Sequence, residues 1–283
     1  MQTNTVTIEE EFMICYFDKI YFNDFVSLPV YIVFICIDGD NELTVPSGAK
    51  RGPFMIGIIA PLYPSKAVFT GTKILIFLFE VDSVFGFALK NLLANKKFID
   101  LSKLITPTTQ ETLEEQLIKL NEKQLVEFLF NEVFELKHDA SPEFDPRISN
   151  VLNLIKKNPL THSFRSTELA KLIFLSHSRF SRLFREQMGV GVKKYSQWLK
   201  IKSAIQIFFK RQRFVDVLNG SNFFNQSHLN RSFKYFFGID PSNAWKRIKG
   251  KYFSGLLFPL KKPIEHHHLM LPNNSIMSCL FLL

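Results

Sequence analysis

The second half of the chain contains an internal repeat. The segment HSRFSRLFREQMGV (177–190) aligns with QSHLNRSFKYFFGI (226–239) at a constant offset of 49 residues. Apolar residues recur three to four positions apart in both copies, which is the spacing of one face of an α-helix. A shorter helical segment precedes each copy, at 166–173 and at 214–221. A short helix, a tight turn and a longer helix, occurring twice, predict two helix-turn-helix units.

Each longer helix of the repeat is expected to have two different faces. In the first copy, Phe180, Leu183 and Phe184 form an apolar face, and the other positions are mostly small, polar or basic. A polar residue that can act as the N-cap stands before each helix, Ser176 in the first copy and Asn225 in the second. The apolar face predicts packing within each unit, and the polar face is then free to contact a partner.

The segment between the copies is predicted to be one continuous helix over 193–209. Its apolar residues, Tyr195, Trp198, Leu199 and Ile205, are available for hydrophobic cores. At ~1.5 Å per residue, a helix of ~17–20 residues is ~25–30 Å long. Successive major-groove faces on one side of a DNA duplex lie ~34 Å apart. One chain can therefore place both longer helices in adjacent turns of the same duplex.

Charge is distributed unevenly along the chain. Residues 1–147 contain 13 Lys and Arg against 21 Asp and Glu, a net charge of −8. Residues 148–262 contain 22 Lys and Arg against 4 Asp and Glu, a net charge of +18. Such asymmetry predicts an acidic sensing half joined to a half that binds a polyanion.

Several classes of protein are disfavoured by the sequence. Cys15, Cys36 and Cys279 are widely spaced, so they form neither a metal-type pair nor a disulfide framework. Glu9–Glu11 stand where a signal peptide would carry basic residues, and no apolar run approaches the ~20 residues of a membrane helix. Nucleophile-elbow, P-loop and dinucleotide motifs are absent. We therefore expect a soluble, cytoplasmic protein that is not an enzyme.

The N-terminal half is predicted to be β-rich. Short runs of β-branched and aromatic residues, separated by Gly, Pro, Ser and Asp, occupy 30–37, 42–45, 54–60 and 73–81. This spacing favours a small sandwich or barrel over a parallel α/β sheet, because no helix-length segment separates the strands.

Two helices and a linker are expected to follow the strands. Leu113, Leu117 and Leu120 share one face of a first helix, where they form an intradomain seam or a dimer interface. Asn121 is the expected N-cap of a second helix that ends near residue 136. The polar stretch 138–146 predicts a linker, and Pro146 after Asp145 predicts that a helix begins there.

Residues 147–249 resemble the DNA-binding domain of the arabinose-regulator (AraC/XylS) family of bacterial transcription regulators. The segments that carry the resemblance are ELAKL, LSHSRFSRLFREQMG, YSQWLKIKSA and SNFFNQSHLNRSFKYFFGIDPS, which end in Gly238, Pro241 and Ser242. The sequence departs from the family pattern at four positions: Leu218 replaces Ala, Asn222 replaces the turn glycine, Lys200 replaces Arg, and Phe174 stands near the first turn.

The resemblance implies DNA contacts for individual residues. Base-reading positions fall on Ser178, Ser181 and Arg182 in the first copy, and on Gln226, Ser227, His228, Asn230 and Arg231 in the second. Phosphate contacts are expected from Arg179, Arg185, Lys193, Lys194 and Lys234. Arg182 is the residue that we expect to contribute most, because a guanidinium can donate to both O6 and N7 of guanine.

The N-terminal half resembles the cupin-like sensing domain of the same family in outline. Residues 1–137 contain no histidine, so the metal cluster of a cupin oxygenase is not expected, and we expect no cofactor. The expected fold class is therefore α+β with two domains, a cupin-like β domain with a helical pair and an all-α double helix-turn-helix domain. The expected division is listed in order: 1–105 sensing domain, 106–137 helical pair, 138–146 linker, 147–249 DNA-binding domain, 250–283 tail without an assigned role.

The predicted function is sequence-specific regulation of transcription, as an activator or as a repressor. The expected partners are double-stranded DNA, RNA polymerase, a small-molecule or protein effector of the N-terminal domain, and a second copy of the chain. Two alternatives stay open from the sequence: a cupin-like enzyme with an appended basic domain, and a non-specific DNA-binding protein for which charge alone suffices.

Overall fold

The protein is described here by a computed structural model covering residues 5–17, 25–71, 73–104, 106–138, 141–157, 165–211, 214–220, 223 and 225–237. Several sequence features lie outside these residues: Gly238, Pro241 and Ser242, the turn residue Asn222, and the tail from residue 250.

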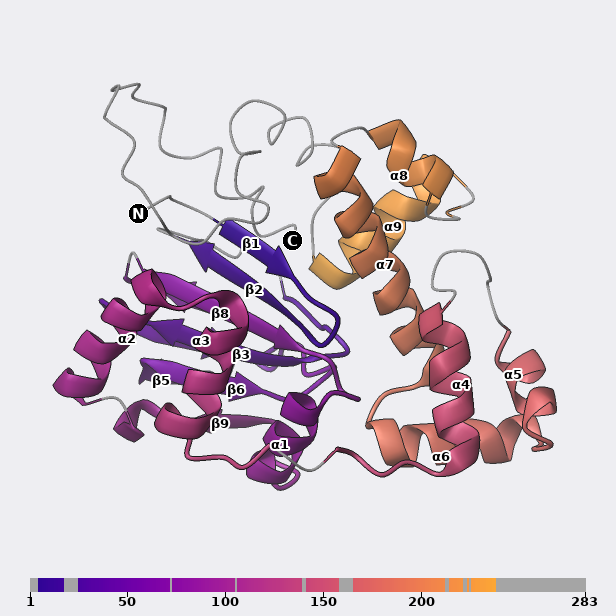
Figure 1. Cartoon of the computed structure of the whole chain (residues 1–283), viewed down its shortest axis with the longest axis horizontal. Coiled ribbons are helices and arrows are strands. Elements are labelled where there is room, and N and C mark those ends of the chain that lie inside the picture. The colour runs from indigo at the N-terminus through magenta and orange to yellow at the C-terminus, as the bar shows by residue number, and fades with distance from the viewer. Residues whose placement is uncertain are drawn as a thin grey trace.

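The N-terminal half is built on two antiparallel sheets (Figure 1). The larger has the order β1-β2-β8-β3-β6-β9 and the smaller β5-β4-β7. The bounds are β1 Thr5–Ile8, β2 Phe12–Phe17, β3 Tyr31–Cys36, β4 Asn41–Thr44, β5 Lys50–Phe54, β6 Ile56–Ile59, β7 Lys66–Phe69, β8 Ile74–Phe79 and β9 Phe98–Asp100. The strands predicted at 30–37, 42–45 and 73–81 are confirmed, and the run 54–60 is divided between the end of β5 and β6.

Strands β3 and β8 form the centre of the core. Both are buried along their whole length, which explains why their sequences YIVFIC and ILIFLF are continuously apolar rather than alternating. They pair with each other in antiparallel register, with Val33 opposite Phe77. Helices lie against one face of this sheet, as Figure 1 shows for α2 (Pro107–Lys119) and α3 (Glu122–Phe128).

The helical pair belongs to the core of this half of the chain. Leu113 and Leu117 are buried within the single chain, so they form the intradomain seam rather than an exposed dimer surface. Asn121 caps α3 as predicted, in a capping box with Gln124, and a π-helical turn, η2 (Leu129–Val133), extends the helix.

One helix was not predicted from the sequence. The helix α1 (Val84–Leu93) begins directly after β8, with Ser83 as its N-cap. A short 3-10 turn, η1 (Ser102–Leu104), follows β9. The apolar run VFGFALKNLL of α1 begins only four residues after the apolar run of β8, so composition does not clearly separate the two elements. The prediction that no helix separates the earlier strands, which disfavoured a parallel sheet, is nevertheless confirmed from β1 to β8 among the described residues.

The C-terminal half is helical, and its elements match the predicted order. Helix α4 (Pro146–Lys157) begins at Pro146 as predicted. The first unit consists of α5 (Ser166–Leu172) and α6 (His177–Met188), and the second of α8 (Phe214–Gly220) and α9 (Gln226–Phe237). Helix α7 (Val192–Arg211) connects them as the expected continuous helix (Figure 1). The fold class is thus α+β with two domains. Among the described residues, no helix combines the length and the apolar character that crossing a membrane requires.

Candidate nucleic-acid interface

Helix α6 has the two faces that its sequence predicts. Phe180, Phe184 and Met188 are buried, and Leu183 packs partly against the same core. Phe184 contacts both Phe180 and Tyr195 of α7, with ring centroids 5.9 and 6.0 Å apart. The apolar face therefore attaches α6 to α7 and directs the opposite face to solvent.

The N-terminus of α6 is closed by the predicted cap. The hydroxyl of Ser176 accepts a hydrogen bond from the backbone N–H of Arg179. At the other end, Gly189 adopts the left-handed conformation with φ 71°, which a glycine accommodates without strain. These two signals define the helix that carries Ser178, Ser181 and Arg182.

The polar face of α6 is open to solvent. Ser178, Arg179, Arg182 and Arg185 are exposed. The Arg182 guanidinium lies 3.6 Å from the Glu186 carboxylate, but both side chains are well exposed, so this pair is weak and Arg182 remains available to a base. Ser181 is half-buried, and its hydroxyl lies 3.3 Å from His177 Nε2.

The longer helix of the second unit, α9, is capped by Asn225 as predicted. The Oδ1 of Asn225 accepts a 2.9 Å hydrogen bond from the backbone N–H of His228. Gln226, Ser227 and Arg231 are exposed. Burial, with the charges of nearby Lys200 and Arg231, lowers the pKa of His228, which therefore presents a neutral ring at neutral pH.

Asn230 lies differently from the other proposed base-reading residues. It is half-buried, and its Oδ1 is enclosed with no hydrogen-bond partner among the described residues. A base contact through this oxygen would require the side chain to turn outward.

The expected phosphate-binding lysines are placed unequally. Lys193 and Lys234 are exposed, whereas Lys194 Nζ lies 3.4 Å from the centroid of the Tyr235 ring. This cation–π contact links the start of α7 to α9. Lys194 therefore helps to hold α9 against α7, and a phosphate would compete with Tyr235 for its ammonium group.

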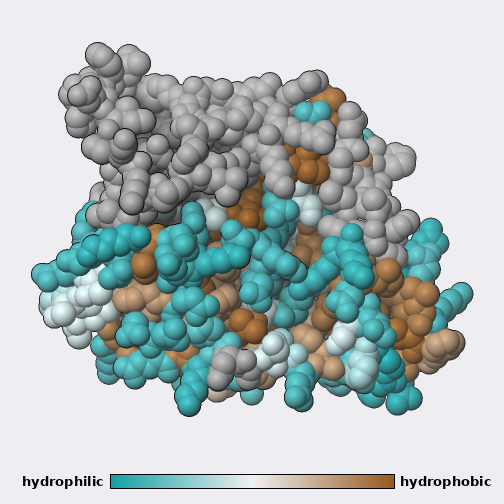
Figure 2. Space-filling view, viewed as in Figure 1, coloured by the Kyte–Doolittle hydropathy of each residue, from teal (hydrophilic) through white to brown (hydrophobic). Residues whose placement is uncertain are grey.

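The turn of the first unit exposes two large apolar side chains. Phe174 is 95% exposed with φ 55°, and Leu172 is 59% exposed. Figure 2 shows hydrophobic residues gathered at the α5 corner of the molecule, beside hydrophilic ones.

Sequence reasoning missed the polar contacts that bind α7 to the N-terminal half. Tyr195 and Trp198 were expected to fill hydrophobic cores; both are buried, but the hydroxyl of Tyr195 donates to Asp82 and the indole N–H of Trp198 to Glu80. The available signal was a pair of acids directly after the apolar strand β8, together with a lysine, Lys202, on the face of α7 that carries Trp198.

Comparison with known proteins agrees with this geometry. A family described as a helix-turn-helix domain matches residues 169–247. The arabinose operon regulatory protein of Escherichia coli (strain K12) is 26% identical over 147 residues, which are 51% of this chain and 50% of the relative. Its counterpart from Salmonella typhimurium is 26% identical over 119 residues, 42% of each chain. The chain thus matches half the length of these curated relatives, or less.

Solved structures extend the likeness to the whole fold. ToxT from Vibrio cholerae is 13% identical, with 84% of this chain and 98% of that chain covered and a TM-score of 0.55. An unsaturated fatty acid-bound structure of ToxT is 14% identical, with 87% and 97% covered and a TM-score of 0.55. At these identities the matches show a shared fold. Residues 169–247 thus match a helix-turn-helix domain family, the chain is similar to the arabinose operon regulatory proteins over half of its length or less, and it shares the fold of ToxT.

Proposed function

We propose that the protein is a sequence-specific DNA-binding regulator of transcription that inserts α6 and α9 into successive major-groove segments of one duplex. The observation that carries this proposal is the pair of capped helices with exposed polar and basic faces, joined by the 20-residue helix α7. The net charge of +18 over residues 148–262 supplies the attraction to the phosphate backbone.

The proposed contacts divide into two kinds. Bases are read from α6 by Ser178, Ser181 and Arg182, and from α9 by Gln226, Ser227, His228, Asn230 and Arg231. Asn230 reads a base only after its side chain has turned outward. Arg179, Arg185, Lys193, Lys194 and Lys234 contact phosphates. Base contacts set which sequence is bound, and phosphate contacts set register and overall affinity.

Arg182 and Arg179 provide a matched test, because both are exposed arginines on the same helix. The operator is first selected from a pool of random duplexes with the full-length protein. Arg182→Ala is then expected to cost about 1–3 kcal/mol on that operator and to relax the preference at one base pair. Arg179→Ala is expected to weaken binding to all sequences alike and to reduce the salt slope by about one. Fluorescence anisotropy over a salt series measures both.

Equal weakening of all sequences by Arg182→Ala would exclude base reading at this residue. If no operator emerges from the selection at all, the protein binds DNA by charge alone.

We further propose that an effector acts on the N-terminal domain, which spans residues 1–105 with the helical pair 106–137 and is linked through 138–146 to the DNA-binding domain at 147–249. Support comes from ToxT structures with an unsaturated fatty acid and with (E)-4-(8-methylnaphthalen-1-yl)but-3-enoic acid. In this chain, an apolar cavity between the sheets has a volume of about 10 Å³, lined by Val26, Leu28, Ile32, Phe34, Ser65, Ala67, Ile76 and Leu78. That is the space of about one water, so a longer ligand needs these side chains to move apart.

A panel of unsaturated fatty acids tests this part of the proposal. A binder is expected to raise the Tm in a concentration-dependent way, since a ligand that binds only the folded state stabilises it. Saturated chains of equal length are the control for non-specific association. RNA polymerase and a second copy of the chain are proposed as further partners, to be tested by co-purification on the selected operator and by sedimentation.

A further inference from the structure

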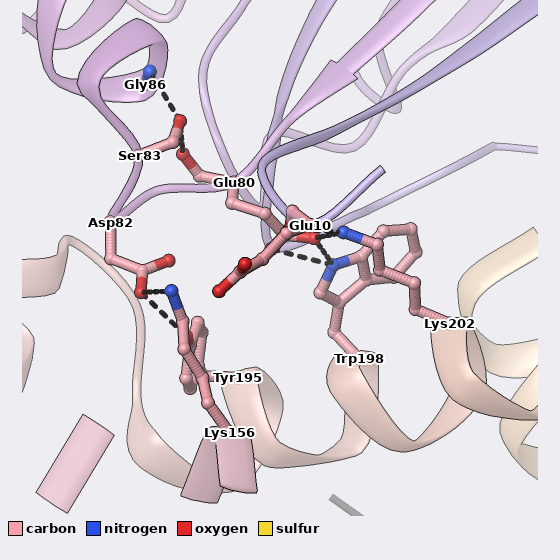
Figure 3. Close-up of polar contacts among 9 residues, drawn as sticks. All are labelled: Glu10, Glu80, Asp82, Ser83, Gly86, Lys156, Tyr195, Trp198 and Lys202. Carbon is pink, nitrogen blue, oxygen red and sulfur yellow. Dashed lines mark hydrogen bonds and ion pairs between the residues drawn. The ribbon is translucent and has the colours of Figure 1, made fainter. Parts of the chain in front are cut away.

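The two halves of the chain meet through a buried polar cluster, drawn in Figure 3. Lys202 Nζ of α7 lies 2.7 Å from Glu80 Oε1, and the indole N–H of Trp198 lies 3.0 Å from both oxygens of the same carboxylate. The side chains of Glu80 and Lys202 are 2% and 6% exposed. Lys202 also donates to the backbone oxygen of Glu10, at 2.7 Å. Two residues of α7 are thus held by one carboxylate from the other half.

A second carboxylate on the same loop makes a parallel set of contacts. Asp82 Oδ2 accepts from the hydroxyl of Tyr195 at 2.9 Å and lies 2.7 Å from Lys156 Nζ of α4. Tyr195, Trp198 and Lys202 recur at the spacing of one helix face. Asp82 Oδ1 is enclosed without a partner among the described residues. We call Glu80, Asp82, Lys156, Tyr195, Trp198 and Lys202 the interdomain latch.

The loop that carries both acids is held by local hydrogen bonds. The Ser83 hydroxyl donates to the backbone oxygen of Glu80 at 2.8 Å and accepts from the N–H of Gly86 at 2.9 Å. A Cβ at Gly86 would lie 2.0 Å from the Glu80 backbone oxygen, so only glycine permits this close approach. The N-terminal turn of α1 therefore fixes the position from which Glu80 and Asp82 reach α7.

The chemistry of the latch suits a switch better than a permanent joint. A buried ion pair adds little net stability, because desolvation offsets the attraction, yet removal of one partner leaves an unpaired buried charge and is strongly destabilising. Burial raises the pKa of Glu80, and the Lys202 ammonium and the indole N–H oppose that rise. Loss of the charge on the Glu80 carboxylate is therefore expected to weaken the contact between the halves strongly.

We propose that the interdomain latch holds α7 against the N-terminal domain, fixes the relative placement of the two recognition helices, and is the contact through which the N-terminal domain controls DNA binding. This inference rests on the proposed function. All the proposed base-reading residues of α6 and α9 except Ser181, His228 and Asn230 are exposed while the latch is closed, so the latched form leaves most of the proposed DNA-binding face open. We therefore assign the latched form as the one that binds DNA, because preorganised helices lose less freedom on binding.

The first experiment measures the halves directly, without DNA. Spin labels are placed on full-length protein at Lys119→Cys and Lys171→Cys, both at exposed positions, with Cys279→Ser in the background. Cys15 and Cys36 are buried. The parent protein is expected to give one narrow distance distribution. Glu80→Gln, which leaves the Lys202 ammonium without a carboxylate, is expected to give a broad distribution at longer distance.

Two further variants separate latch opening from simple loss of a charge. Glu80→Gln combined with Lys202→Met removes both charges. The amide oxygen introduced at position 80 can still accept the hydrogen bond of the Trp198 indole N–H, so the double variant is expected to restore the narrow distribution. Glu114→Gln removes the partner of Lys73 in an ion pair of similar length, 2.6 Å, that lies within the N-terminal half, and is expected to leave the distance distribution unchanged. If Glu80→Gln does not fold, Asp82→Asn opens the second site instead, where Lys156 is 31% exposed and can regain solvent.

The second experiment measures affinity for the selected operator. The opened variant is expected to bind it about 5-fold or more weakly, the range typical of coupling between sites, and the double variant is expected to recover. Unchanged distances in both Glu80→Gln and Asp82→Asn would overturn the latch whatever DNA does. If the variants open the latch but bind the operator unchanged or more tightly, the assigned role of the latch in DNA binding is overturned. Failure to select any operator would instead contradict the proposed function and leave the distance result intact.

Discussion

Asp145 stands at the junction between the two halves, where α4 begins. Its carboxylate accepts hydrogen bonds from the Nη2 and Nε of Arg147, at 2.6 and 2.9 Å, and from the backbone N–H of Arg147, at 2.9 Å. These bonds stabilise the ionised form and lower the pKa of Asp145 from 3.8 to about 2.

We predict that this carboxyl group titrates near pH 2 in the folded protein. Because the pKa is lower in the folded than in the unfolded chain, Asp145 contributes stability above about pH 3.8 and loses it as the pH falls toward 2. Carboxyl-detected NMR measures the titration. Arg147→Ala is expected to move the midpoint back toward 3.8, and a midpoint that stays near 2 in that variant would show that the side-chain bonds are not the cause.

Single residues differ in how far the sequence predicts their roles. The exposure of Ser178, Arg182, Gln226 and Arg231 follows from helical periodicity, because the buried positions of each helix are plainly apolar. The half-buried position of Asn230 does not follow from periodicity. This residue lies at the edge of the apolar face, where its side chain can point inward or outward, and local packing decides between the two. His228 is similar, because its pKa is lowered first by burial and then by the charge of Lys200 on α7, and both depend on how α9 packs in the folded chain.

Among the elements, the turn of the first helix-turn-helix holds a residue in an unfavourable conformation. Phe174 has φ 55°, in the left-handed region that costs a non-glycine residue roughly 1–2 kcal/mol. Its ring is 95% exposed, so little packing offsets this strain.

Phe174→Gly is therefore predicted to raise the free energy of unfolding by up to about 1 kcal/mol, since part of the relief is lost to greater freedom of the unfolded chain. Urea denaturation of the full chain measures the change. Leu172→Gly is the matched control, because it removes another exposed apolar side chain from within α5 and is expected to destabilise by about 0.5–1 kcal/mol. Destabilisation by both variants would mean that the Phe174 ring makes a stabilising contact.

Secondary structure was predictable where the apolar period and the caps agreed. Ser176, Asn121 and Asn225 marked helix starts correctly, and Asp145 with Pro146 marked the start of α4. Helix α1 was missed because its apolar residues follow those of β8 after only four residues, and the capping signal of Ser83 is weak beside that run. The physical cause is that α1 is set by its close packing on the Glu80 loop through Gly86, which is a tertiary effect.

For the molecule as a whole, the sequence predicts two halves of opposite charge but not how they join. Glu80 and Lys202 are 122 positions apart, and Asp82 and Tyr195 are 113 apart. No periodicity links residues so distant, and each acid alone is equally compatible with a solvated loop. The pairing becomes visible only once β8 ends beside α7 in the folded chain (Figure 3).

The length of α7 leads to a prediction about operator geometry. Its 20 residues give a rigid rod of roughly 30 Å between the two units, close to the ~34 Å between major-groove faces one turn apart. Two half-sites at that spacing are therefore expected to bind one protein chain.

Insertion of 5 base pairs between the half-sites turns the second half-site to the opposite side of the duplex, and insertion of about 10 restores the side but doubles the distance. We predict that both insertions lower affinity to that of a single half-site, a loss of about 10-fold or more given ~1–3 kcal/mol per lost base contact. Gel-shift titration at fixed salt measures the series, with equal insertions outside the operator as the control. Recovery of full affinity at 10 base pairs, but not at 5, would mean that α7 bends or that two chains occupy the site, since one straight helix cannot span both turns.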